Sequence, residues 1–96
     1  MGGVPQVFRN RQRSLTMEWK YSRQTNHIHV VHMGYIAVVS LTKTMSGYWG
    51  NVSKIEGYQV PLLAGKFAES IELAVDWAEA FIALQIVEAQ VKDAPK

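Results

Sequence analysis

The sequence predicts an α+β fold in which a three- to four-stranded antiparallel sheet packs on one long C-terminal helix, behind a flexible basic N-terminal arm. Three observations predict it. Apolar residues alternate with a period of two through much of residues 16–60, which is typical of strands. After residue 70 the spacing changes to three and four, which indicates a helix. The length of 96 residues suits one domain, which we expect over residues 16–96.

The N-terminal arm is predicted over residues 1–15. It contains two glycines and a proline, which disfavour regular structure, and few apolar residues. Its three arginines are Arg9, Arg11 and Arg13. The apolar runs that follow these arginines are shorter than a secretory signal requires, so we do not expect a signal peptide.

The strands follow from alternation. Met17, Trp19 and Tyr21 fall on one face of the first strand, and β-branched residues fill the third. Polar or glycine-containing stretches separate the segments, and residues 43–47 have the composition of a hairpin connection. The predicted strands are residues 16–22, 27–33, 35–42 and 48–55, with a short edge strand at 58–60 before Pro61.

The helix is predicted from about Ser70 to about Lys92. Ser70 suits an N-cap because its hydroxyl can accept a hydrogen bond from an otherwise unpaired amide of the first turn. Neither glycine nor proline occurs between this residue and Pro95. Acidic residues interrupt the apolar stretch 71–91, which excludes a membrane-spanning helix because buried charges are too costly there.

The helix has two apolar stripes, whereas a helix that only covers a sheet needs one. The first stripe is Ile71, Val75, Ala78, Ile82, Ile86 and Ala89, and the second is Leu73, Trp77, Ala80, Leu84, Val87 and Val91. A helix of this length spans roughly 34 Å and a strand about 17–20 Å, so we expect the C-terminal half to overhang the sheet. An exposed apolar patch usually marks an interface. We therefore predict a homo-oligomer, first of all a dimer, through Leu73, Trp77, Leu84, Val87 and Val91. The alternative is that strands or the arm cover both faces of the helix.

The chain shows no spacing diagnostic of catalysis. It lacks cysteine, which excludes disulfides and thiolate metal sites. His27 and His29 share a strand face but have no recognisable third ligand, and acidic residues on one helix face are expected to be solvated. We expect a protein that is not an enzyme, with no catalytic residues, metal or cofactor.

Charge divides the chain. Residues 1–54 carry a formal charge of +6 and residues 55–96 a charge of −4, which together give the net +2. A basic arm is a common way to hold phosphates, and an exposed aromatic can stack on a base. The residues that would contact a nucleic acid are Arg9, Arg11, Arg13, Lys20, Arg23 and Trp49. An alternative for the basic residues is that they pair with acidic residues within or between subunits. An alternative for Trp49 is that its ring packs against side chains of neighbouring strands.

The order of features over residues 48–82 also supports a resemblance. Trp49, Gly57 and the run Gly65–Phe67 precede a helix with Ala74 and Trp77, followed by Ala78 and Glu79. This order resembles small phage and prophage proteins of unknown function in which one C-terminal helix closes a β-rich domain. It also resembles the sheet-reading DNA-binding domains of tyrosine integrases, from which it differs by having few basic residues on the strands. No functional residue is carried over from either resemblance.

The leading expectation is a non-enzymatic accessory protein of phage or prophage type that binds an unidentified protein partner as a homo-oligomer. The alternative is a nucleic-acid-binding accessory protein that uses the arginine arm and an exposed aromatic. We expect a cytoplasmic protein without membrane attachment.

Overall fold

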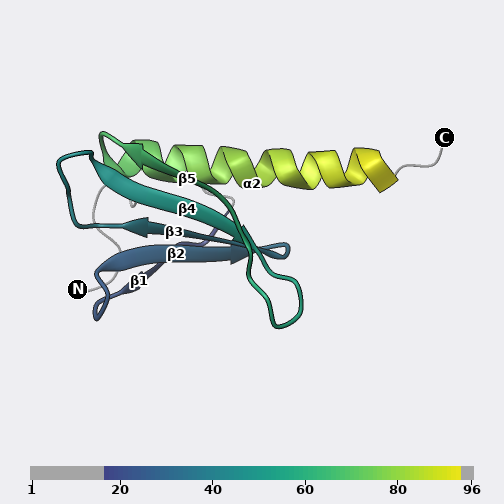
Figure 1. Ribbon diagram of the computed structural model, residues 1–96, viewed down its shortest axis with the longest axis horizontal. Helices are drawn as coiled ribbons and strands as arrows, with labels where there is room; N and C mark the ends of the chain where they lie inside the picture. Colours follow the sequence, from purple (N-terminus) through teal and green to yellow (C-terminus); the bar gives the residue numbers. More distant parts are fainter. Residues whose placement is uncertain (1–16, 94–96) are drawn as a thin grey trace.

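A computed structural model of the chain describes residues 17–93, in which five strands form one antiparallel sheet and one helix lies on one of its faces (Figure 1). The strands are β1 (Lys20–Ser22), β2 (His27–His32), β3 (Tyr35–Ser40), β4 (Tyr48–Lys54) and β5 (Leu62–Ala68), and the helix is α2 (Ile71–Asp93). The predicted α+β class is confirmed.

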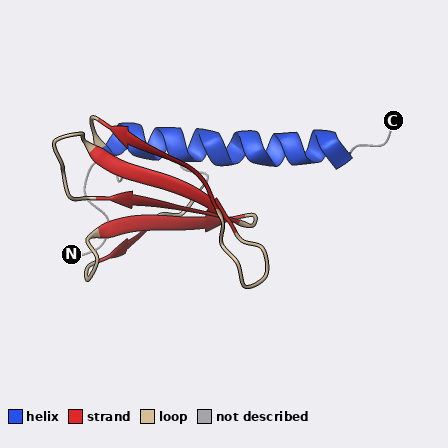
Figure 2. Ribbon diagram, viewed as in Figure 1, coloured by secondary structure: helices blue, strands red, loops and turns tan. Residues whose placement is uncertain are grey.

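The sheet is a meander. Each strand pairs antiparallel with the next along the chain, so the spatial order is β1-β2-β3-β4-β5 (Figure 2). Within residues 17–93, β1 and β5 therefore form the two edges. Connections between sequential neighbours are the simplest way to join antiparallel strands. The helix follows the last strand and returns across β5, β4 and β3.

Two predicted elements differ from the structure. The edge strand expected at residues 58–60 is wrong, because these residues lie in the β4–β5 loop beside an isolated bridge between Glu56 and Gln59. The edge strand is β5, just after Pro61, so the sheet has five strands. The first strand is shorter than expected, although Met17 and Trp19 are buried ahead of it. The predicted arm, residues 1–15, lies outside the described residues.

The core lies between one face of the sheet and α2. Alternation turns every second residue of β2, β3 and β4 toward the sheet face on which α2 lies. Val75, Ala78 and Ile82, in the middle of the predicted first stripe, are buried between the helix and this face of the sheet. The buried apolar residues are Met17, Trp19, Ile28, Val30, Tyr35, Ala37, Val39, Val52, Ala74, Val75, Ala78 and Ile82.

The start of α2 is fixed by a cap. Ser70 Oγ accepts a hydrogen bond of 3.1 Å from the backbone N–H of Leu73, as the sequence predicts for an N-cap. Gly47 sets the neighbouring loop: its φ is +113°, and a Cβ there would collide with the carbonyl oxygen of Ala68. The β3–β4 loop therefore approaches the end of β5 directly before the helix begins.

The end of α2 extends past the sheet. Ile82 is the last buried residue of the helix, and residues 83–91 contain none. Figure 1 shows the corresponding yellow part of the helix continuing beyond the strands. The overhang expected from the two lengths is therefore present.

Candidate interaction surfaces

The predicted second stripe of α2 is largely uncovered by residues 17–93. Leu73, Leu84, Val87 and Val91 are each more than half exposed. Three of these four lie beyond Ile82, on the part of α2 that the sheet does not reach. The residues proposed from the sequence for an oligomer interface thus form an exposed apolar strip, which we call the outer stripe.

Trp77 is the exception within that set. Its ring is partly buried, packs against the core and lies over Gly50 of β4. It also contacts Phe81, with ring centroids 5.7 Å apart. Trp77 therefore belongs to the boundary between the core and the outer stripe.

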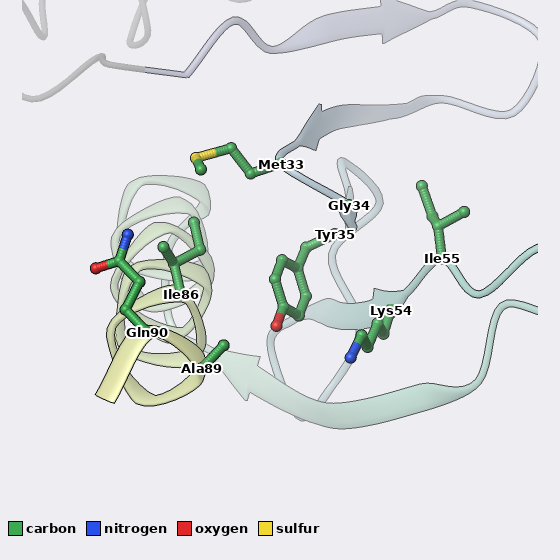
Figure 3. A pocket seen from close by; sticks show the side chains of 8 residues that line it. All are labelled: Met33, Gly34, Tyr35, Lys54, Ile55, Ile86, Ala89 and Gln90. Carbon is green, nitrogen blue, oxygen red and sulfur yellow. The ribbon is translucent and has the colours of Figure 1, made fainter. Parts of the chain in front are cut away.

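A groove lies where α2 leaves the sheet. It has a volume of about 450 Å³, and its apolar lining comes from the β2–β3 turn, the end of β4 and the helix. Figure 3 shows Met33 and Ile86 on neighbouring sides of it, with Tyr35 between the strands and the helix. Its lining residues are Met33, Gly34, Tyr35, Lys54, Ile55, Ile86, Ala89 and Gln90. The sequence did not predict this groove, because it depends on where the helix crosses the sheet.

The second sheet face is opposite α2, and no helix or strand of residues 17–93 covers it. The register places three residues in one row across it: Lys20 of β1 opposite His29 of β2, and His29 opposite Val38 of β3. Val31 is also exposed here. We call this the open face.

Trp49 lies on the open face and packs across to β5. Its ring covers Gly65, where a Cβ would collide with the indole, and its centroid is 4.9 Å from that of Phe67. The ring therefore packs across the strands, as the competing interpretation of Trp49 expected, and its aromatic partner is Phe67 of β5. About a third of Trp49 and nearly half of Phe67 remain exposed. The result is an aromatic pair at one edge of the sheet.

His27 and His29 are also on the open face, with ring centroids 5.5 Å apart. Thr25 Oγ1 lies 2.6 Å from His27 Nδ1. Desolvation, and then the positive charge of His29, lower the pKa of His27 below its ordinary value. Residues 17–93 contain no group of three or more His, Cys, Asp or Glu that could hold a metal ion.

One acidic side chain on α2 has a structural contact that the sequence did not reveal. Trp19 Nε1–H donates a hydrogen bond of 2.8 Å to Glu79 Oε2. Sixty residues separate the two along the chain, so no local pattern predicts the pair. Glu79 is therefore not simply part of a solvated stripe. It holds the segment before β1 against the helix.

The residues predicted to contact a nucleic acid are only partly placed together. Lys20 and Trp49 share the open face, but they lie on β1 and β4. Arg23 is exposed in the β1–β2 turn. Arg9, Arg11 and Arg13 lie outside the described residues. The structure therefore shows an aromatic pair with dispersed cations rather than a continuous basic surface on residues 17–93.

Comparisons of the chain with protein-family models, curated proteins and solved structures find no match. The helix of residues 17–93 lacks the sustained apolar length that crossing a membrane requires.

Proposed function

We propose that this chain is a non-enzymatic accessory protein that self-associates as a homodimer through the outer stripe of α2 and presents its sheet to other molecules. The observation that carries the proposal is the exposed apolar half of the helix. Leu84, Val87 and Val91 are each more than half exposed, so in a monomer their burial contributes little to the stability of the fold. Contiguous exposed apolar surface of this kind typically marks an interface.

The spacing of the outer stripe favours another helix as the contact. Together with Trp77 at its boundary and Ala80, the outer stripe recurs at alternating intervals of four and three residues, which is the heptad repeat of coiled coils. The positions of this repeat are Leu73, Trp77, Ala80, Leu84, Val87 and Val91. A second copy supplies a helix with the same repeat, and closed two-fold dimers are the commonest symmetric assemblies.

The test is the molar mass in solution over a range of protein concentrations. The wild-type chain is expected to show a dimer by light scattering at micromolar concentration. Leu84→Glu places an unpaired charge in the interface of both subunits, which should raise the dissociation constant by roughly a hundredfold or more. Met45→Glu makes the same kind of change at a fully exposed loop position and should leave the dimer intact. A monomeric wild-type chain at hundreds of micromolar would contradict the proposal.

A second candidate function, nucleic-acid binding, is favoured by one observation. Trp49 and Phe67 form an exposed aromatic pair, and Lys20 stands on the same sheet face. Aromatic rings on a sheet can stack with unpaired bases, and nearby cations can contact phosphates. Arg23 and Lys43 are exposed in loops at the end of the sheet nearest this pair.

Binding of a fluorescent single-stranded oligonucleotide tests this second candidate. Phosphate contacts should make the affinity fall steeply with salt, and a variant lacking residues 1–15 should lose most of it. Trp49→Ala should weaken binding about tenfold if its ring stacks on a base. Absence of binding at low salt would remove this candidate without affecting self-association.

A further inference from the structure

The groove where α2 leaves the sheet is separate from the outer stripe. Ile86 and Ala89 form its helix wall. At about 3.6 residues per turn, these two residues lie on the opposite side of α2 from Leu84, Val87 and Val91. A dimer through the outer stripe therefore leaves the groove open in both copies, and a ligand in the groove goes beyond the proposed function.

The size and lining of the groove suit a small molecule with an apolar chain. Its volume of about 450 Å³ falls within the roughly 300–1,000 Å³ of small-molecule sites in proteins. Apolar side chains predominate in its lining, and Figure 3 shows Met33 extending from its turn toward the helix that carries Ile86. Sites of this composition bury the apolar part of a ligand and use a few polar groups to fix its orientation.

Met33 occupies an unusual position beside the groove. It has φ 49° and the following Gly34 has φ 87°, so both residues of the β2–β3 turn are left-handed. This conformation is unfavourable for residues other than glycine, asparagine and aspartate. Met33 is also 65% exposed. Strained residues cluster at ligand-binding sites, and a methionine side chain adapts its shape to what it contacts. Met33 thus offers an apolar contact that the turn itself does not need.

The polar end of the groove comes from two neighbouring strands. Tyr35 of β3 and Lys54 of β4 are direct partners in the sheet, and alternation turns both side chains toward the face that carries α2. Figure 3 shows the Tyr35 hydroxyl and the Lys54 ammonium group pointing the same way. Both groups can donate hydrogen bonds, so together they match the two acceptor oxygens of a carboxylate.

Charge at the groove favours an anion. Among the described residues that line it, Lys54 is the only one with a charged side chain. Its Nζ lies 3.8 Å from Glu56 Oε2, and both side chains are about half exposed, so this ion pair is weak. An ammonium group has three donors, and the contact with Glu56 leaves others available to a ligand.

We propose that the groove binds a free aliphatic carboxylate of the fatty-acid class. The carboxylate contacts Tyr35 and Lys54, and the aliphatic chain lies between Met33 and Ile86. Every lining residue belongs to one chain, so the site is complete in a monomer and occurs twice in a dimer. Burial of Met33 by the chain of the ligand offsets the unfavourable conformation of the turn.

Isothermal titration calorimetry with decanoate tests the proposal. The wild-type chain is expected to bind one decanoate per copy with a dissociation constant on the order of 100 μM. Decylammonium has the same chain with the opposite charge and should bind about tenfold more weakly. Absence of saturable decanoate binding at millimolar concentrations would overturn the proposal, and so would equal binding of the two probes.

Reversal of the charge at the polar end assigns the carboxylate to Lys54. Lys54→Glu should weaken decanoate binding about tenfold and make decylammonium the tighter ligand. Such an exchange of preference requires an intact groove, so unfolding cannot produce it. Lys43→Glu makes the same charge change at the opposite end of the sheet and should leave both affinities unchanged. If Lys54→Glu leaves the preference for decanoate intact, the assignment is wrong.

Filling the groove locates the aliphatic chain. Ala89→Trp places a large ring among the lining residues and should weaken decanoate binding about tenfold. Glu88→Trp adds the same ring one residue earlier, at an exposed position outside the lining, and should leave the affinity unchanged. Urea unfolding checks that both variants are folded. An unchanged affinity in a folded Ala89→Trp variant would exclude the groove.

Leu84→Glu separates this inference from the proposed function. It should dissociate the dimer and leave the decanoate affinity unchanged. If it instead removes decanoate binding, the probe binds the outer stripe and the groove assignment is overturned. A wild-type monomer that shows the expected preference for decanoate would contradict the proposed function and support the groove.

Vesicles of phosphatidylglycerol distinguish a free ligand from a membrane lipid. The wild-type chain is expected to stay in the supernatant when the vesicles are sedimented. Cosedimentation that Ala89→Trp removes would show that the groove takes lipid at a membrane surface, and it would overturn the proposal of a free carboxylate.

Discussion

The two halves of α2 continue the same apolar stripe in different surroundings. In the half that begins at Ile71, the first stripe includes the fully buried residues Val75, Ala78 and Ile82. In the half that ends at Asp93, the equivalent stripe continues as Ile86 and Ala89, which are only partly buried or exposed. The same helical spacing thus contributes to a core in one half and lines a groove in the other. Hydrophobic pattern alone does not decide burial; the length of the opposing sheet does.

This difference should separate folding stability from assembly. Changes in the first half remove contacts that exist within one chain, so they act on the free energy of unfolding. Changes in the second half remove contacts that require a second copy, so they act on the dissociation constant. Substitutions in and around the helix test that separation.

The largest effect is expected at Ile82. Ile82→Ala should lower the free energy of unfolding by about 3 kcal/mol, because the side chain is fully buried and its removal leaves a cavity. Leu84→Ala is the matched change two residues on and should cost less than about 0.5 kcal/mol in the monomer. Urea unfolding at low protein concentration measures both. Equal losses would show that α2 is packed similarly along its whole length.

A smaller effect is expected at Glu79, which attaches the segment before β1 to the packed half. Glu79→Ala should cost about 1.5 kcal/mol, because it leaves the Trp19 indole N–H without this acceptor. Glu79→Gln keeps a carbonyl acceptor and should cost less than half as much. Thermal unfolding followed by Trp fluorescence measures the difference. If both variants lose the same stability, the charge of Glu79 matters more than the hydrogen bond.

The two residues other than glycine that have a left-handed backbone within residues 17–93 provide the third test. Asn26 has φ 51° and donates a hydrogen bond to Thr42, whereas Met33 has φ 49° with an apolar side chain. Met33→Asn should stabilise the monomer by about 1 kcal/mol, and Asn26→Met should destabilise it by a similar amount. Differential scanning calorimetry compares the two. A destabilising Met33→Asn would indicate that Met33 already has important contacts within its own chain.

The smallest effect is expected from pH. Because desolvation and the positive charge of His29 lower the pKa of His27 in the folded state, the unfolded state binds more protons in that range. Stability should therefore decrease as pH falls through the ordinary histidine pKa of about 6.5 toward the lower pKa that His27 has in the folded state. His27→Gln should reduce this decrease in a urea titration. His27 is on the open face, opposite α2, so this substitution should leave the dissociation constant of the dimer unchanged.

The sequence predicts the middle of the fold well. The alternation of β2 to β4 and the helical spacing of α2 place these elements within two residues of their bounds. Each of these segments has a buried face that imposes a period. β5 was not predicted because its sequence, Leu62–Ala68, has no alternation and contains Gly65. It forms because β4 pairs with it and the Trp49 ring fills the space above that glycine.

The candidate surfaces were predicted to different extents. The outer stripe could be predicted because the spacing of its residues is visible within one helix. The expected helix is also longer than a typical strand, which indicates that part of its apolar surface extends beyond the sheet. The groove could not, since Met33, Lys54 and Ile86 come from three elements whose approach depends on the whole fold. The Trp49–Phe67 pair could not be predicted either, because Phe67 lies on β5, the strand that the sequence pattern did not indicate.

The meander also determines the order in which the chain can fold. All strand pairs join consecutive segments, so each hairpin can close over a short loop at a small entropic cost. The helix is different, because its contacts with β3 join segments that are further apart in the sequence than the paired strands are. Rapid hairpin formation followed by slower helix docking is the expected kinetic sequence. The rate of the docking step should then be set by the residues of α2 that reach the sheet, while substitutions in the overhang leave it unchanged.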